Sequence, residues 1–133
     1  MSPATPPAFT GRHIVVADED PKMVRFVITT LREDGHAVFH AYDALSATQL
    51  ALGLELCDLL ISNTKVEGAN GVELIQQLRQ CKPELPIIYL ANIGRSTPEA
   101  EAALPRDIPI LREPFTAEDL RGTVHAMLNG GAR

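Results

Sequence analysis

Short apolar runs alternate five times with segments of helical period along this chain of 133 residues. No other feature restricts the fold as strongly. The runs have the length of strands, and several are apolar almost throughout, as expected of strands buried on both faces. They span residues 13–17, 37–42, 57–62, 86–91 and 108–111.

The segments between the runs carry apolar residues at the i, i+3, i+4, i+7 spacing of one helix face. Three such stripes are Val24, Val27, Ile28 and Leu31; Ala47, Leu50, Ala51 and Leu54; and Gly71, Leu74, Ile75 and Leu78. Asp20 before Pro21 predicts a helix start, and Gly35 predicts the end of that helix. Residues 96–99 and 116–119 resemble capping boxes and predict two further helix starts, the second with Leu120, Val124, Met127 and Leu128 facing inward.

This pattern predicts an α/β domain made of five strand–helix units. Each right-handed crossover must cover the sheet, so we expect a doubly wound parallel sheet with helices on both faces, in three layers. The predicted domain covers residues 12–129. Residues 1–11 are rich in proline, and residues 130–133 contain two glycines, so both ends are predicted to be tails or linkers.

Composition restricts the partners. The net charge of −5 argues against a nucleic-acid groove and against binding to an anionic membrane surface, because both need clustered Lys and Arg. The sequence contains no signal-peptide pattern and no apolar run of membrane-spanning length, so a cytoplasmic location is expected. Cys57 and Cys81 are predicted to be reduced thiols.

In an open sheet of this kind, ligands gather beyond the carboxyl ends of the strands. The residues at these ends therefore form the predicted site. Their simplest interpretation is structural, since an acid such as Asp20 often caps a helix and an asparagine often occupies a turn. The residues are Asp18, Glu19 and Asp20 after the first strand, Asn63 and Lys65 after the third, Ala91 and Asn92 after the fourth, and Glu113 after the fifth.

Over residues 12–129 the chain resembles the receiver domains of bacterial two-component response regulators, which have a CheY-like, flavodoxin-like fold. The matching segments are 14–21 with its acids, 58–63 at the third strand, Gly68 and 70–74, 86–91, and 113–115. The resemblance implies strand order 2-1-3-4-5. It also implies an Mg²⁺ site at Asp18, Glu19 and residue 63, and signalling through phosphorylation at residue 63.

The chain departs from this pattern at four positions. The resemblance implies an aspartate that accepts the phosphoryl group, a Ser or Thr, a Lys and a switching aromatic. This sequence has Asn63, Ala91, Glu113 and Ile110 there. An amide is not a nucleophile, so phosphoryl capture at Asn63 is not expected. The four departures together predict a degenerate pseudo-receiver that is not an enzyme.

Asp18, Glu19 and Glu113 would place three negative charges together, and like charges must be compensated. A weakly held Mg²⁺ could bind the vestigial ligands Asp18, Glu19 and Asn63. The ammonium of Lys65 could instead reach the acids, or one acid could protonate more readily than usual. Lys65 is the favoured source of positive charge. Its ammonium is already attached to the chain, so bringing it to the acids costs less free energy than removing water from a free Mg²⁺. No other cofactor is expected.

The predicted function is phosphorylation-independent binding of a protein partner, such as a histidine kinase, an output domain or another signalling protein. The face formed by the fourth helix, fifth strand and fifth helix is the predicted contact surface and could pair two copies. Two alternatives stay open: phosphorylation at a non-standard acceptor or a deamidated Asn63, and a flavodoxin-like small-molecule binder. The second lacks a Gly-rich phosphate loop after the first strand.

Overall fold

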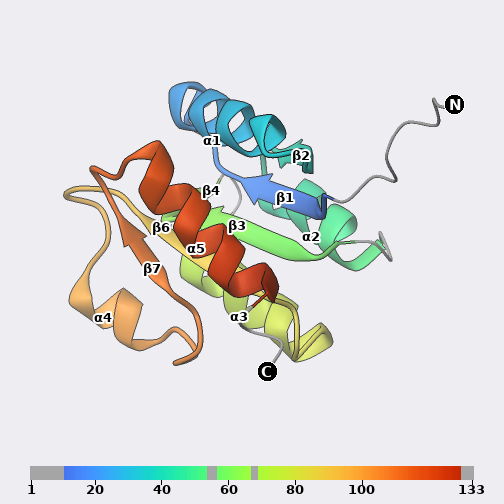
Figure 1. Ribbon diagram of the computed structural model, residues 1–133. Coiled ribbons are helices and arrows are strands. Elements are labelled where there is room, and N and C mark those ends of the chain that lie inside the picture. Colours follow the sequence, from blue (N-terminus) through green and yellow to red (C-terminus); the bar gives the residue numbers. More distant parts are fainter. Residues whose placement is uncertain (1–10, 54–56, 67–68, 130–133) are drawn as a thin grey trace, which may run out of the picture.

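The computed structural model describes residues 11–53, 57–66 and 69–129, with backbone alone at residues 65, 66 and 69. Five parallel strands form one sheet in the order β2-β1-β3-β6-β7 (Figure 1). Counted among themselves, these strands have the order 2-1-3-4-5, so the predicted flavodoxin-like α/β fold is confirmed. They are β1 (His13–Ala17), β2 (Ala37–Ala41), β3 (Leu59–Asn63), β6 (Ile87–Ala91) and β7 (Ile110–Arg112).

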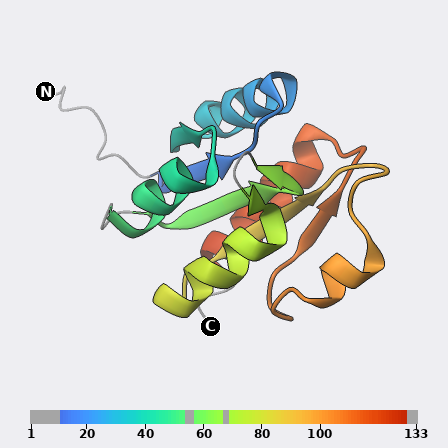
Figure 2. The same cartoon turned by 180° about the vertical axis from the view of Figure 1, so that it is seen from behind.

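Helices cover both faces of the sheet, which gives three layers. On one face lie α1 (Pro21–Glu33) and α5 (Ala117–Asn129), whose apolar residues join one core cluster. On the other lie α2 (Ala44–Gly53), α3 (Gly71–Cys81) and the short α4 (Pro98–Ala102). The view from behind shows α2 and α3 across this second face (Figure 2).

Alternation along the strands divides the core into these two clusters. Ile14 and Val16 of β1 pack toward α1 and α5, whereas Val15 and Ala17 pack toward α2 and α3. All four side chains are fully buried. Since successive side chains of a strand point to opposite faces, residues beyond Ala17 follow the same alternation, and Asp18 falls on the α1 side.

The predicted ends of α1 are confirmed. The carboxylate of Asp20 accepts a hydrogen bond from the Lys22 amide at 3.0 Å, and Pro21 occupies the first turn. Gly35 follows the helix with φ of +88°, a conformation that side chains with a Cβ rarely adopt. The predicted starts at Thr97 and Thr116 are confirmed as well, because both side chains accept from backbone amides three residues later.

Several boundaries differ from the prediction. Strand β7 begins at Ile110 because Pro109 has no N–H to donate, and β3 extends to include Asn63. A small antiparallel pair, β4 (Lys65–Val66) and β5 (Ala69–Asn70), follows β3 where the sequence predicted a loop. Leu54, Gly68 and the predicted tails, apart from Gly11, lie outside the described residues.

Cys57 is buried, Cys81 is exposed, and both are free thiols, as predicted. Among the described segments, the helices are too short or too polar to cross a lipid bilayer.

Candidate functional site at the carboxyl edge of the sheet

Asp18 and Asn63 meet at the centre of the site. Strand pairing sets Ala17 of β1 opposite Ser62 of β3, which brings the next residue of each strand side by side. Nδ2 of Asn63 donates a hydrogen bond to Oδ2 of Asp18 at 2.5 Å. Each of these two residues is 1% exposed. An amide–carboxylate pair therefore occupies the inner end of the site.

Burial controls the charge state of Asp18. Loss of hydration raises the pKa of its carboxyl from 3.8 to about 6, although hydrogen bonds from the Asp20 amide and from Asn63 favour the charged form. The negative charge of Asp20 raises this pKa further, and His40 lowers it. One acid of the site is thus protonated more readily than usual, which is one of the three predicted ways of relieving the crowded charge.

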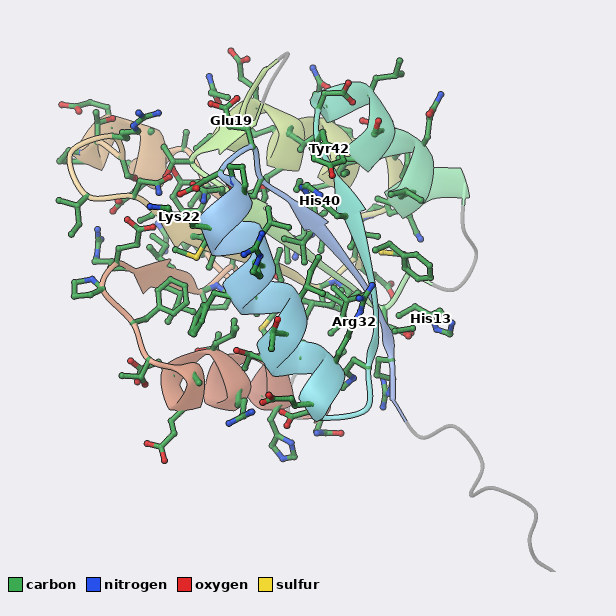
Figure 3. The ribbon with its side chains drawn as sticks, turned by 90° about the horizontal axis from the view of Figure 1, so that it is seen from above. His13, Glu19, Lys22, Arg32, His40 and Tyr42 are labelled. Atoms are coloured by element: carbon green, nitrogen blue, oxygen red, sulfur yellow. The ribbon has the colours of Figure 1, made fainter. Side chains whose placement is uncertain are left out.

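His40 supports the same strand end from β2. Its Nε2 lies 2.9 Å from the backbone oxygen of Asp18, within hydrogen-bond distance. Figure 3 shows His40 of β2 beside Tyr42, which follows that strand, with Glu19 beyond the end of β1 and His13 at the opposite end of β1. The rings of His40 and Tyr42 are 3.9 Å apart between centroids. These contacts fix the backbone from which Asp18 projects.

The oxygen of the Asn63 side chain is in an unusual position. Oδ1 is buried and accepts no hydrogen bond from the described residues, whereas Nδ2 is engaged with Asp18. A buried carbonyl oxygen without a donor typically costs about 1–3 kcal/mol. The amide therefore offers an unused acceptor within the site.

Ala91 and Glu113 lie at the ends of neighbouring strands. Ala91 ends β6 and is 4% exposed, and its carbonyl accepts from the Glu113 amide at 3.1 Å. The Glu113 carboxylate accepts from Nδ2 of Asn92 at 3.0 Å and from the Ile93 amide at 3.4 Å. The methyl group of Ala91 therefore lies where the resemblance implies a hydroxyl. The Glu113 carboxylate, bound by neutral donors, lies where it implies an ammonium.

A cavity of about 470 Å³ opens between these strand ends. Four carboxylates and one guanidinium belong to its described lining, which is therefore negative overall. Its residues are Asp18, Glu19, Asp20, Asn63, Asn92, Ile93, Arg95 and Glu113. Sequence reasoning missed Ile93 and Arg95. Both lie in the loop after β6. Their position beyond the end of a strand is the sequence signal that could have placed them in the site.

Ser62 is buried and faces away from Asn63, toward α3. An ideal Cβ built on Gly71 would lie 3.3 Å from Oγ of Ser62 and 1.9 Å from the backbone oxygen of Asn63. Only a glycine leaves room for the first turn of α3 against the end of β3. Ser62 therefore lies outside the acidic cavity and has no place as a substitute acceptor there.

The predicted switch position, Ile110, is half-buried on β7, and its strand partner Tyr89 is the aromatic residue of this region. Tyr89 is fully buried, with its hydroxyl 3.2 Å from Oγ of Ser96. Ser96 donates to the Glu101 carboxylate at 2.6 Å, and Arg112 binds the same carboxylate at 2.5 Å. Sequence reasoning missed this chain of contacts, which connects β6, α4 and β7.

A resident Mg²⁺ would require oxygen ligands at about 2.1 Å in octahedral directions. Both oxygens of Asp18 accept N–H groups, and Asn63 turns its NH₂ group toward that carboxylate. Among the residues whose side chains are described, no three His, Cys, Asp or Glu converge as a metal site would require. As arranged, these residues do not fit a resident Mg²⁺.

The side chain of Lys65 is outside the described residues, so its predicted role in charge compensation stays a prediction.

The chain was compared with known proteins. The model of the response regulator receiver domain family matches residues 14–125. The response regulator receiver protein CpdR of Brucella abortus (strain 2308) is 27% identical over 117 residues, covering 88% of this chain and 97% of CpdR. The transcriptional regulatory protein GlrR of Escherichia coli (strain K12) is 29% identical over 91 residues, which is 68% of this chain but 20% of GlrR.

Solved structures share the fold. A receiver domain protein from Clostridium thermocellum superimposes with a TM-score of 0.82 at 21% identity, covering 91% of this chain and 97% of that one. The receiver domain of an HD domain-containing protein from Pseudomonas fluorescens Pf-5 gives 0.82 at 22% identity, with coverages of 92% and 98%. The family model extends over both core clusters and the strand ends that carry the acids, and this chain therefore belongs to the response regulator receiver domain family, the signalling modules of two-component systems.

Proposed function

We propose that this chain is a pseudo-receiver, which acts by binding a protein partner without phosphoryl transfer at residue 63. The observation that carries the proposal is the buried Asn63 at the end of β3, with its amide bonded to Asp18 at 2.5 Å. The lone pair of an amide nitrogen is delocalised into its carbonyl group, and the amide oxygen carries no full negative charge, so neither atom attacks phosphorus as a carboxylate does.

The neighbouring positions support the same conclusion. A phosphoryl group brings about −1.5 to −2 charges, which a receiver site must meet with cations and hydrogen-bond donors. Ala91 has no hydroxyl to donate, and Glu113 adds a carboxylate to the lining of the cavity. An incoming phosphate would therefore be repelled where the family pattern would hold it.

The proposal includes a vestigial site whose negative charge is compensated in part. In it Lys65 supplies charge compensation, and Asp18, Glu19 and Asn63 are what remains of the Mg²⁺ ligands. A restored aspartate at residue 63 would place two carboxylates in the contact that the amide now bridges, and such a pair would require a cation. The amide removes that requirement at residue 63, while the other carboxylates of the lining keep the cavity acidic.

Receiver domains interact with kinases and output domains, and the proposed partner belongs to these classes. The chain spans nearly the whole of CpdR but a fifth of GlrR, so it can act as a separate protein or within a longer regulator. The α4–β7–α5 surface, which includes the Glu101–Arg112 ion pair, is the proposed face for a partner or a second copy. Prolines 98, 105 and 109 restrict rearrangement there.

The test is exposure of the purified protein to acetyl phosphate and Mg²⁺, followed by intact-mass analysis. We expect no phosphorylated species. The matched control is the triple variant Asn63→Asp, Ala91→Thr, Glu113→Lys, which restores nucleophile, hydroxyl and ammonium on the same scaffold. This control should gain a hydroxylamine-sensitive adduct. Stoichiometric labelling of the unaltered chain, at residue 63 or elsewhere in the cavity, would refute the proposal.

A further inference from the structure

An apolar groove adjoins the acidic cavity. It has a volume of about 370 Å³ and is lined by Met23, Phe26, Ile93, Glu113, Pro114 and Phe115. Two of these residues, Ile93 and Glu113, also line the acidic cavity, so the two depressions are continuous. Ile93 is 71% exposed at their junction. Together they form a composite surface with one acidic part and one apolar part.

The acidic part has a specific need for a hydrogen-bond donor. Oδ1 of Asn63 is unpartnered although the residue is 1% exposed and lines the cavity. The carboxylates around it are acceptors too. The ligand that suits this wall is a cation that also donates hydrogen bonds, such as an ammonium or a guanidinium group.

The apolar part decides which kind of cation fits. A hydrated metal ion gains nothing from a groove formed by Met23, Phe26 and Phe115, whereas the stems of Lys and Arg bury hydrocarbon while their heads stay in a polar site. The Phe26 and Phe115 rings lie 5.9 Å apart, and they belong to α1 and to the segment after β7. The groove therefore offers an ordered aromatic floor beside the acids.

We propose that this composite surface binds a protein segment that carries a Lys or Arg flanked by apolar residues. The charged head enters the acidic cavity toward Asn63 and Glu113, and the flanking apolar side chains cover the groove. Figure 3 shows Glu19 before α1 and Lys22 in its first turn, and Glu19 and Met23 line the acidic cavity and the groove, respectively. The inference rests on the proposed function and goes beyond it, because it adds a second binding surface, apart from the α4–β7–α5 face, and names the chemistry of a partner that needs no phosphate.

The test is amide NMR titration of the full chain with the peptide acetyl-Leu-Lys-Leu-amide. Matched peptides replace the lysine by norleucine, which keeps an apolar stem without charge, or by glutamate. We expect the lysine peptide to shift amides 18–20, 63 and 92–93 together with those near Phe26 and Phe115. Affinity for the norleucine peptide should be lower by about fivefold, the usual scale for one partly screened ion pair.

Variants test the two parts separately. Glu113→Gln keeps one acceptor oxygen for Asn92 and should weaken lysine-peptide binding by about fivefold, whereas Ile93→Ser should weaken it by about threefold. The matched controls are Glu84→Gln, an exposed acid that lines a different cavity, and Leu45→Ser, an apolar residue that is 67% exposed on α2. Both controls should bind the lysine peptide as the unaltered chain does.

Three results of the peptide titrations would overturn the inference. They are equal binding of the lysine and norleucine peptides, peptide shifts confined to α4, β7 and α5, or no shift at all. Saturation of residues 18–20 and 63 by about 1 mM Mg²⁺, with loss of peptide binding, would also overturn it by making the cavity a metal site. The labelling assay is independent of these titrations. Phosphorylation would refute the pseudo-receiver proposal, whereas the peptide titrations alone decide whether the composite surface binds a basic segment.

Discussion

The Asp18 carboxylate is buried beside an amide, and this placement makes the free energy of unfolding depend on pH. Its pKa of about 6 in the folded state exceeds the value of 3.8 expected in the unfolded chain. Between these values the native state binds more protons, so the Asp18 contribution to stability falls as pH rises from about 4 to about 6 and stays low above that. The shift corresponds to about 3 kcal/mol.

Replacement of Asp18 by asparagine removes this titration. We expect the unfolding free energy of Asp18→Asn, relative to the unaltered protein, to be higher at pH 7 than at pH 4 by roughly 2 kcal/mol. Urea unfolding with EDTA present, at several pH values, measures the difference. A difference in unfolding free energy that does not change with pH would contradict the raised pKa of Asp18. Glu84→Gln is the control, since its side chain is exposed and lines a different cavity.

At the scale of elements, the site depends on how closely α3 approaches the end of β3. The helix begins at Gly71, where an added Cβ would lie 1.9 Å from the Asn63 backbone oxygen. Gly71→Ala should therefore lower the unfolding free energy by about 2 kcal/mol or more, since the backbone must shift to relieve the clash. Urea unfolding measures the loss, and shifts of the Asn63 and Asp18 amides should accompany it.

Gly122→Ala is the matched control for this substitution. Gly122 is exposed within α5, and its added Cβ would meet nothing within 4 Å. There the usual helix preference should dominate, and stability should rise by about 0.5–1 kcal/mol. Equal effects of the two substitutions would show that the contact between α3 and β3 is not tight.

At the scale of the whole molecule, the net charge of −5 separates the two proposed kinds of association. Two copies of an acidic chain repel one another, so pairing through the α4–β7–α5 face should strengthen as salt rises from about 10 to about 150 mM. Binding of a basic segment should weaken over the same range. Sedimentation equilibrium and peptide titration measure the two trends, and the opposite sign in either would count against the corresponding association.

Particular residues show how far the sequence predicts this molecule. Asp18 and Asn63 were expected to meet, because parallel strands end at one edge and each residue follows or ends such a strand. The direction of the Glu113 carboxylate was not predictable, since it depends on donors from Asn92 and Ile93 in the loop after β6. The burial of Tyr89 against Ser96 likewise depends on where α4 packs.

By itself, the sequence determined the strand–helix alternation, the helix caps at Asp20 and Gly35, and the replacement of the expected nucleophile by Asn63. These features follow from local chemistry: side-chain period, backbone preference and the identity of a functional group. The tertiary structure alone decided that Oδ1 of Asn63 has no donor among the described residues, that burial raises the pKa of Asp18, and that an apolar groove continues the acidic cavity. Each of these depends on distances between segments far apart in the chain, which no local pattern specifies.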